Sequence, residues 1–81
     1  MLVKAAKHFE KTRKAVLQFV IDQGGVAAMG EMHDYSERRY FIAHRKFSTL
    51  MEGIVGEGLV NYDEGAGEAS ITEAGRAYIA G

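Results

Sequence analysis

The sequence predicts a small, mainly α-helical domain that carries one β-hairpin near its C-terminal end. Two observations lead to this fold class. Apolar residues recur at three- and four-residue steps through successive stretches, which is the period of an amphipathic helix. A glycine-rich polar turn at 63–68 then separates two short apolar runs, a pattern typical of a hairpin. The 81 residues suit a single domain.

The first helix is expected over 2–23. Its stripe widens between Ala15 and Ile21, so that half should be deeply buried. Gly24 and Gly25 provide the stop, because glycine adopts the left-handed cap conformation without steric strain. The first half instead carries a cationic set around a thin apolar line: Lys4, Lys7, Lys11, Arg13 and Lys14. This set is either a solvated face or a surface that pairs with a second copy or with phosphates.

An extended entry at 26–28, with room for a very short strand, leads into a second helix that ends at Tyr40. Its expected inner stripe consists of Met29, Met32, His33, Ser36 and Tyr40. A three-residue turn follows, with Ile42 as the apolar plug between two helices. The third helix should begin at Ala43 or His44. Its apolar stripe comprises Phe47, Leu50, Met51, Ile54 and Val55.

The third helix should stop at 56–58, where two glycines weaken it. Strands are then expected at 59–62 and 69–71, around the polar turn. Thr72 is a good N-cap for a last helix, 73–80, which should pack through Ala74, Ala77 and Tyr78. This order of elements is that of a winged helix-turn-helix: a long first helix (1–25), the helix-turn-helix (26–60), the wing (59–72) and a C-terminal helix (72–80).

Two segments, IVGEGLV at 54–60 and ITEAGR at 71–76, resemble the MarR-like and PadR-like winged-helix transcriptional regulators over residues 28–80. The resemblance implies a wing at 63–70. It also implies DNA-reading positions on the third helix at His44, Arg45, Lys46, Ser48, Thr49 and Glu52. This chain departs from the family in two ways: its wing has no Lys or Arg, and almost nothing follows Ala80. A dimer would therefore have to form through the first helix.

Charge is unevenly distributed along the chain, although the net charge is only −1. Residues 1–46 carry nine Lys and Arg against five Asp and Glu, a local charge of +4, whereas residues 47–81 carry one Arg against six acids, a local charge of −5. Such asymmetry indicates a charged partner surface. The cationic half favours DNA, while the acidic wing residues Asp63, Glu64 and Glu68 would be repelled by phosphates.

Two functional interpretations follow, both based on binding. In the first, the chain is a dimeric, sequence-specific binder of double-stranded DNA. Arg38, Arg39, Arg45 and Lys46 contact phosphates, and Arg45, Ser48 and Thr49 approach base edges in the major groove. In the second, it is a winged-helix adaptor that binds a protein partner through its acidic C-terminal face, or through Phe41 if that ring is exposed.

Enzymatic, metal and membrane functions are not expected. Neighbours in His33-Asp34-Tyr35-Ser36 point to different faces of a helix and cannot form a relay. His8, His33 and His44 have no spacing that brings two imidazoles to one helix face, so neither a metal nor another cofactor is predicted. Cysteine is absent, and no apolar run approaches the ~20 residues of a membrane span. The N-terminus lacks a signal-peptide core, and we expect a cytoplasmic protein whose first residue is Met1.

Overall fold

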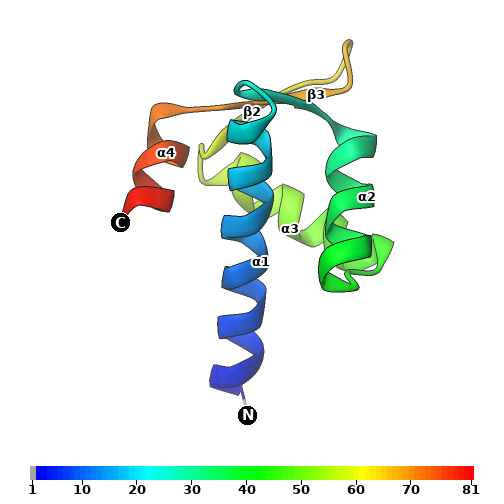
Figure 1. Ribbon diagram of the computed structural model, residues 1–81, viewed down its shortest axis with the longest axis vertical. Coiled ribbons are helices and arrows are strands. Elements are labelled where there is room, and N and C mark those ends of the chain that lie inside the picture. The colour runs from blue at the N-terminus through cyan, green and yellow to red at the C-terminus, as the bar shows by residue number, and fades with distance from the viewer. Residues whose placement is uncertain (1) are drawn as a thin grey trace.

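A computed structural model of the chain describes residues 2–81, with side chains from residue 9 onward. This part of the chain is mainly helical and includes a small antiparallel sheet, as the sequence predicts (Figure 1). Its elements, in chain order, are α1 (Leu2–Asp22), β1 (Val26–Ala28), α2 (Met29–Tyr40), α3 (His44–Gly56), β2 (Val60–Asp63), β3 (Glu68–Ile71) and α4 (Glu73–Ala80). The helix boundaries differ from those predicted by about one residue at most.

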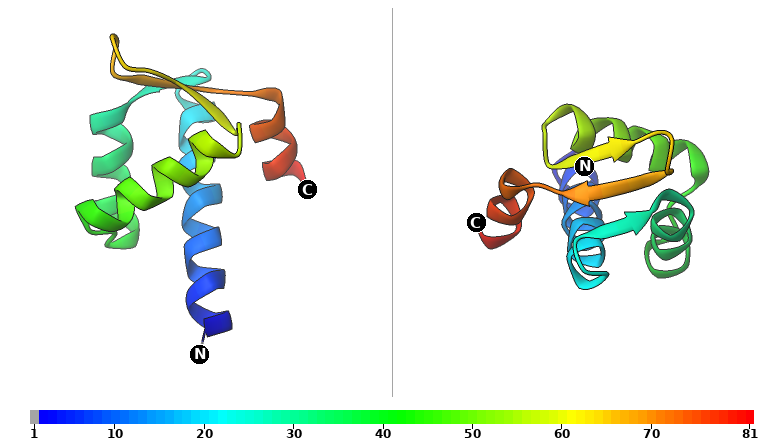
Figure 2. Two further views of the ribbon diagram at one scale, coloured as in Figure 1. Left: turned by 180° about the vertical axis from the view of Figure 1, so that it is seen from behind. Right: turned by 90° about the horizontal axis from the view of Figure 1, so that it is seen from above.

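The sheet has three strands rather than the two of the predicted hairpin. β3 lies in the centre, with β2 and β1 antiparallel on either side (Figure 2, right). Val26 pairs with Ser70 and Ala28 with Glu68, while the amide of Ile71 donates to the carbonyl of Gly25 at 2.8 Å. The sequence left room for a short strand at 26–28, but three residues are too few to reveal a pairing partner.

α1 runs through the middle of the molecule, between α2 and α4, and its N-terminal half projects beyond the other elements (Figure 1). Thr12, Val16, Leu17 and Val20 are buried, whereas the side chains of Lys4 and Lys7 lie outside the described residues. The predicted pairing of this end with a second copy therefore stays a prediction. Within residues 2–81, no helix combines the length and the apolar character needed to cross a membrane.

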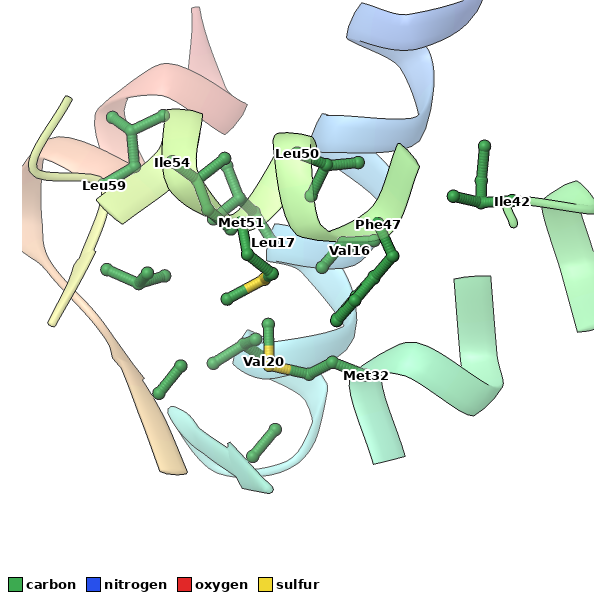
Figure 3. Close-up of a cluster of buried hydrophobic side chains, with 13 residues drawn as sticks. Val16, Leu17, Val20, Met32, Ile42, Phe47, Leu50, Met51, Ile54 and Leu59 are labelled. Carbon is green, nitrogen blue, oxygen red and sulfur yellow. The ribbon is translucent and has the colours of Figure 1, made fainter. Parts of the chain in front are cut away.

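The core lies between α1, the inner side of α3 and the sheet (Figure 3). It contains most of the predicted stripe of α3, namely Phe47, Leu50, Met51 and Ile54, together with Met32 from α2 and the plug Ile42. Val55 is a correction, since its side chain is 38 % exposed. It lies at the edge of the stripe, and the space beneath the end of α3 is filled by Ile54 and Leu59 instead.

α4 packs through only part of the predicted set. Tyr78 packs against the core as predicted, together with Ile79, whereas Ala74 and Ala77 are exposed and Gly75 is buried. The reason is a close approach, because a Cβ at Gly75 would overlap the carbonyl oxygen of Leu59. The predicted N-cap is confirmed: the hydroxyl oxygen of Thr72 accepts a hydrogen bond from the amide of Gly75 at 2.9 Å.

Candidate nucleic-acid interface

The turn between α2 and α3 brings the end of one helix next to the start of the other. It is closed by Phe41, whose backbone is left-handed (φ 56°) and whose amide donates to the carbonyl of Glu37 at 3.0 Å. Ile42 is buried beneath the turn, but the Phe41 ring is 88 % exposed. Glycine or asparagine usually occupies such a cap. A left-handed backbone is unfavourable for a bulky residue such as Phe41. Its large apolar ring nevertheless lies in solvent at this position.

Four cationic side chains flank this turn. Arg38 and Arg39 lie in the last turn of α2, and Arg45 and Lys46 in the first turn of α3. All four are exposed, and among the described side chains none forms an ion pair with a carboxylate. We refer to these four residues as the cationic turn.

The helix dipole stabilises one pair of these cations and destabilises the other. At the C-terminus of α2, Arg38 and Arg39 complement the negative end of the helix dipole. At the N-terminus of α3 the same charge is opposed, because Arg45 and Lys46 lie where the dipole is positive. No acidic residue lies in the first turn of α3, and its N-cap, Ala43, offers no side-chain hydrogen bond. The start of α3 thus presents free amide groups and positive charge together.

Arg38, Arg39 and Tyr35 line an open hollow of about 250 Å³ beside the cationic turn. The Tyr35 ring stacks on Phe19, with 4.6 Å between the ring centroids. Burial raises the pKa of the Tyr35 phenol above its usual value, and the nearby Tyr40 adds to this effect. The hollow is therefore lined by a neutral phenol and two guanidinium groups, which suits an anion such as a phosphate.

The predicted DNA-reading positions of α3 are all exposed: His44, Arg45, Lys46, Ser48, Thr49 and Glu52. The Thr49 hydroxyl donates to the carbonyl of Arg45 at 3.3 Å. One edge of this surface is less polar than predicted, because it borders a shallow hollow of about 310 Å³. That hollow is lined by Met29, His44, Phe47, Ser48, Met51, Glu52 and Tyr62.

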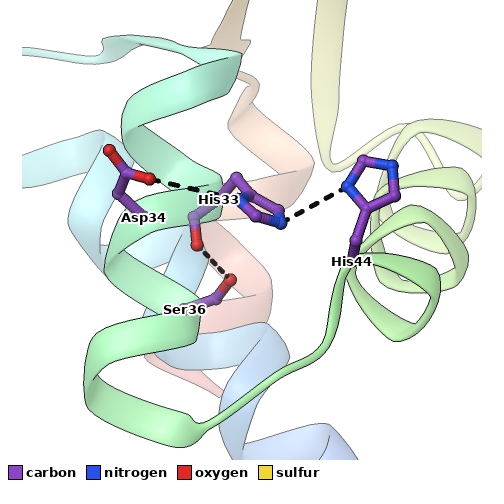
Figure 4. Close-up of polar contacts among 4 residues, drawn as sticks. All are labelled: His33, Asp34, Ser36 and His44. Atoms are coloured by element: carbon purple, nitrogen blue, oxygen red, sulfur yellow. Dashed lines mark hydrogen bonds and ion pairs between the residues drawn. The ribbon is translucent and has the colours of Figure 1, made fainter.

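The sequence interpretation missed a contact between two histidines. His33 Nε2 lies 3.4 Å from His44 Nδ1, and the rings meet edge to face (Figure 4). The spacing argument considered one helix face only, and the two imidazoles meet because the short turn folds α2 onto α3. Ser36 takes no part in this contact, since its hydroxyl donates to the carbonyl of His33.

The turn between β2 and β3 is acidic and exposed, with Asp63, Glu64 and Glu68 around it. The carboxylate of Asp63 accepts a hydrogen bond from the amide of Ala66 at 3.2 Å, so it stabilises the turn locally. The amide of Met29 also donates to the carbonyl of Gly67 at 2.9 Å. This bond ties the turn to the start of α2.

Comparison of the chain with protein-family models, with curated proteins and with solved structures finds no match. The clearest arrangement of exposed residues on this chain is the cationic turn, next to the uncapped start of α3.

Proposed function

We propose that the protein is a small, dimeric transcriptional regulator of the winged helix-turn-helix class, which binds double-stranded DNA sequence-specifically. In this proposal α2 and α3 form the helix-turn-helix, α3 enters the major groove, and the β2–β3 hairpin is the wing. The order of the elements and the resemblance of segments 54–60 and 71–76 to MarR-like and PadR-like regulators support this assignment.

The observation that carries the proposal is the cationic start of α3. A cation in the first turn of a helix is unfavourable by roughly 0.3–1 kcal/mol, and a helix without a capping side chain leaves amide groups unsatisfied. Arg45 and Lys46 place two positive charges in the first turn of α3, and the N-cap of this helix, Ala43, has no capping side chain. A bound phosphate would reverse both penalties, because it supplies negative charge and accepts hydrogen bonds from the free amides.

The exposed residues of the proposed interface have two roles, contact with phosphates and contact with base edges. Arg38, Arg39, Arg45 and Lys46 contact phosphates, which position the protein without reading sequence. Arg45, Ser48 and Thr49, with His44 beside them, approach base edges, where guanidinium and hydroxyl groups can discriminate base pairs. Four cations give few contacts for one protomer. A dimer formed through α1 doubles them and reads two half-sites.

The test is the double variant Arg45→Ala/Lys46→Ala, assayed by fluorescence anisotropy with a random-sequence DNA duplex at low salt. We expect loss of duplex binding with an almost unchanged melting temperature, because both side chains are exposed and form no ion pair with a side chain described by the structure. The matched control is Lys11→Ala/Arg76→Ala, which removes the same charge from exposed positions on α1 and α4. The control should retain duplex binding.

Two results would contradict the assignment. Equal loss of binding in both double variants would mean that only net charge matters, and that α3 is not the reading element. Absence of binding by the wild-type protein at low salt would remove DNA as the ligand altogether.

The exposed ring of Phe41 favours a second candidate function, a winged-helix adaptor that binds a protein. Arg38 and Arg39 precede this 88 % exposed ring, and so the fitting partner has an apolar pocket rimmed by acidic side chains. The adaptor function predicts one stoichiometric protein partner in cross-linking experiments, and Phe41→Ala should lose this partner. It also predicts no duplex binding by the wild-type protein. Duplex binding that survives Phe41→Ala selects the first function.

A further inference from the structure

We propose that His33 and His44 together bind a divalent transition-metal ion such as Zn²⁺ between α2 and α3. The proposal rests on the geometry of these two side chains and does not depend on DNA binding. It assigns a chemical role to the contact that spacing along the sequence could not reveal.

The separation of the two nitrogens fits a shared metal ion. His33 Nε2 and His44 Nδ1 are 3.4 Å apart and face each other (Figure 4). Zn–N bonds of about 2.0–2.1 Å at a tetrahedral angle place two ligand nitrogens about 3.3–3.4 Å apart. The spacing of the two nitrogens therefore suits chelation. The rings must turn so that both lone pairs converge on one ion, and the nitrogen facing the ion must be unprotonated on each ring.

The surroundings of His33 restrain this ring. Its side chain is 24 % exposed, and the ring meets Phe47 edge to face, with 5.0 Å between centroids. Its other nitrogen, Nδ1, lies 4.0 Å from the carboxylate of Asp34. Metal-bound histidines commonly have a carboxylate on this far side, and Asp34 would take that role if the Nδ1–carboxylate contact shortened to a hydrogen bond on metal binding. His44, by contrast, is exposed, so water can fill the remaining metal positions.

A competing set of ligands lies on α2 alone. Ligand atoms of His33, Asp34 and Glu37 all fall within 4.8 Å of one another. Both carboxylates are exposed, however, and the constrained partner of His33 is the imidazole of His44. The charges around the pair act in both directions, since Arg45 and Lys46 repel a cation while Asp34 and Glu37 attract one. The two ligand sets share His33 and differ in His44, Asp34 and Glu37, so substitution of His44 or of Glu37 separates them.

A metal ion at this position would restrain α2 and α3 relative to each other. The ion would join the middle of α2 to the first residue of α3, across the turn that carries Phe41. It would also occupy Nδ1 of His44, which lies among the residues proposed to read DNA. Under the proposed function, the metal would therefore alter the reading surface, whereas the site itself would exist in either case.

The experiment is calorimetric titration of the whole protein with Zn²⁺ alone, supported by the absorption spectrum of Co²⁺ as a probe of tetrahedral coordination. We expect one ion per chain and a melting temperature that rises with Zn²⁺. His44→Gln should abolish binding and leave the fold intact, because this side chain is exposed. Asp34→Asn should weaken binding by about 10–100-fold.

His8→Gln and Glu37→Gln are the controls. His8→Gln removes one imidazole from α1, and Glu37→Gln disables only the competing set; both should bind Zn²⁺ as the wild type does. The proposal is overturned if His44→Gln keeps wild-type affinity, or if Glu37→Gln loses it. It is equally overturned if the wild-type protein binds no Zn²⁺.

Discussion

Gly75 shows how a single residue fixes the position of an element. A Cβ at this position would overlap the carbonyl oxygen of Leu59 and lie 2.7 Å from Ile71 Cδ1. Because the first of these is a backbone atom, relief would require α4 to move away from the chain that enters β2. We expect Gly75→Ala to lower the free energy of unfolding by about 1–3 kcal/mol, as overpacking typically does. Urea denaturation followed by circular dichroism measures this loss.

Gly30→Ala is the matched control. Gly30 is an exposed residue of α2, and nothing lies within 4 Å of a Cβ built there. Alanine loses less conformational freedom than glycine in a helix, so this variant should gain roughly 0.5–1 kcal/mol. Equal stability of Gly75→Ala and Gly30→Ala would contradict the close packing of α4 against Leu59.

Helical period predicted the centre of each buried stripe well and its edges poorly. Phe47, Leu50 and Ile54 are buried as expected, because they lie on the midline of the α3 stripe. Val55 lies at the edge, where the shape of the neighbouring elements decides burial. In α4, no property of the sequence indicated that Gly75 would be the buried position, since this depends on how closely Leu59 passes.

At the scale of elements, an ion pair joins α1 to the end of α3. Arg13 Nη2 lies 2.7 Å from Glu57 Oε1, and the Tyr78 ring of α4 lies 5.5 Å from Arg13 Cζ. The hydrogen bond from Arg13 holds the pKa of the Glu57 carboxyl below its usual value. The same bond raises the pKa of Arg13, so the guanidinium stays charged.

The sign of the pH effect follows from the lowered pKa of Glu57. Its contribution to stability is present above the pKa of the unfolded chain, close to 4.5, and is lost as the pH falls through the lower pKa of the folded state. Glu57→Gln should therefore melt below the wild type at pH 7, and the two should converge at pH values below the folded pKa. Thermal melts over this range test it. Glu52→Gln, which removes an exposed carboxylate without an ion pair, should give no comparable convergence.

Element type and order could be predicted because they depend on local signals, such as the two glycines after α1 and the cap Thr72. Apart from the β2–β3 hairpin, contacts between elements could not. The pairing of β1 with β3 and the meeting of His33 with His44 both depend on how separate elements fold onto one another. For the candidate interface, the exposed residues could therefore be predicted from the sequence. The hollows and the histidine pair could not, because they depend on how the elements fold together.

At the scale of the whole molecule, the cationic turn and the acidic hairpin tip are separated in space. The cationic turn is at the start of α3, whereas the acidic residues surround the tip of the β2–β3 hairpin (Figure 2, left). These two points lie apart in this view, and the hairpin tip projects away from the helices. Under the proposed function, we therefore expect phosphates to meet the cationic turn and not the hairpin tip.

The salt dependence of duplex binding tests this arrangement and the oligomeric state together. If all four cations of the cationic turn contact phosphates, the slope of log affinity against log salt should be about −3.6 for one protomer and about −7 for a dimer. Arg45→Ala/Lys46→Ala should reduce the magnitude of this slope by about 2 per protomer, measured at low salt where residual binding persists.

Anisotropy titrations at several salt concentrations give the slope, and light scattering gives the mass of the complex. A dimeric complex with a slope near that of one protomer would show that only one copy of α3 engages the DNA. A slope near zero would exclude phosphate contacts, and with them the assignment of the cationic turn.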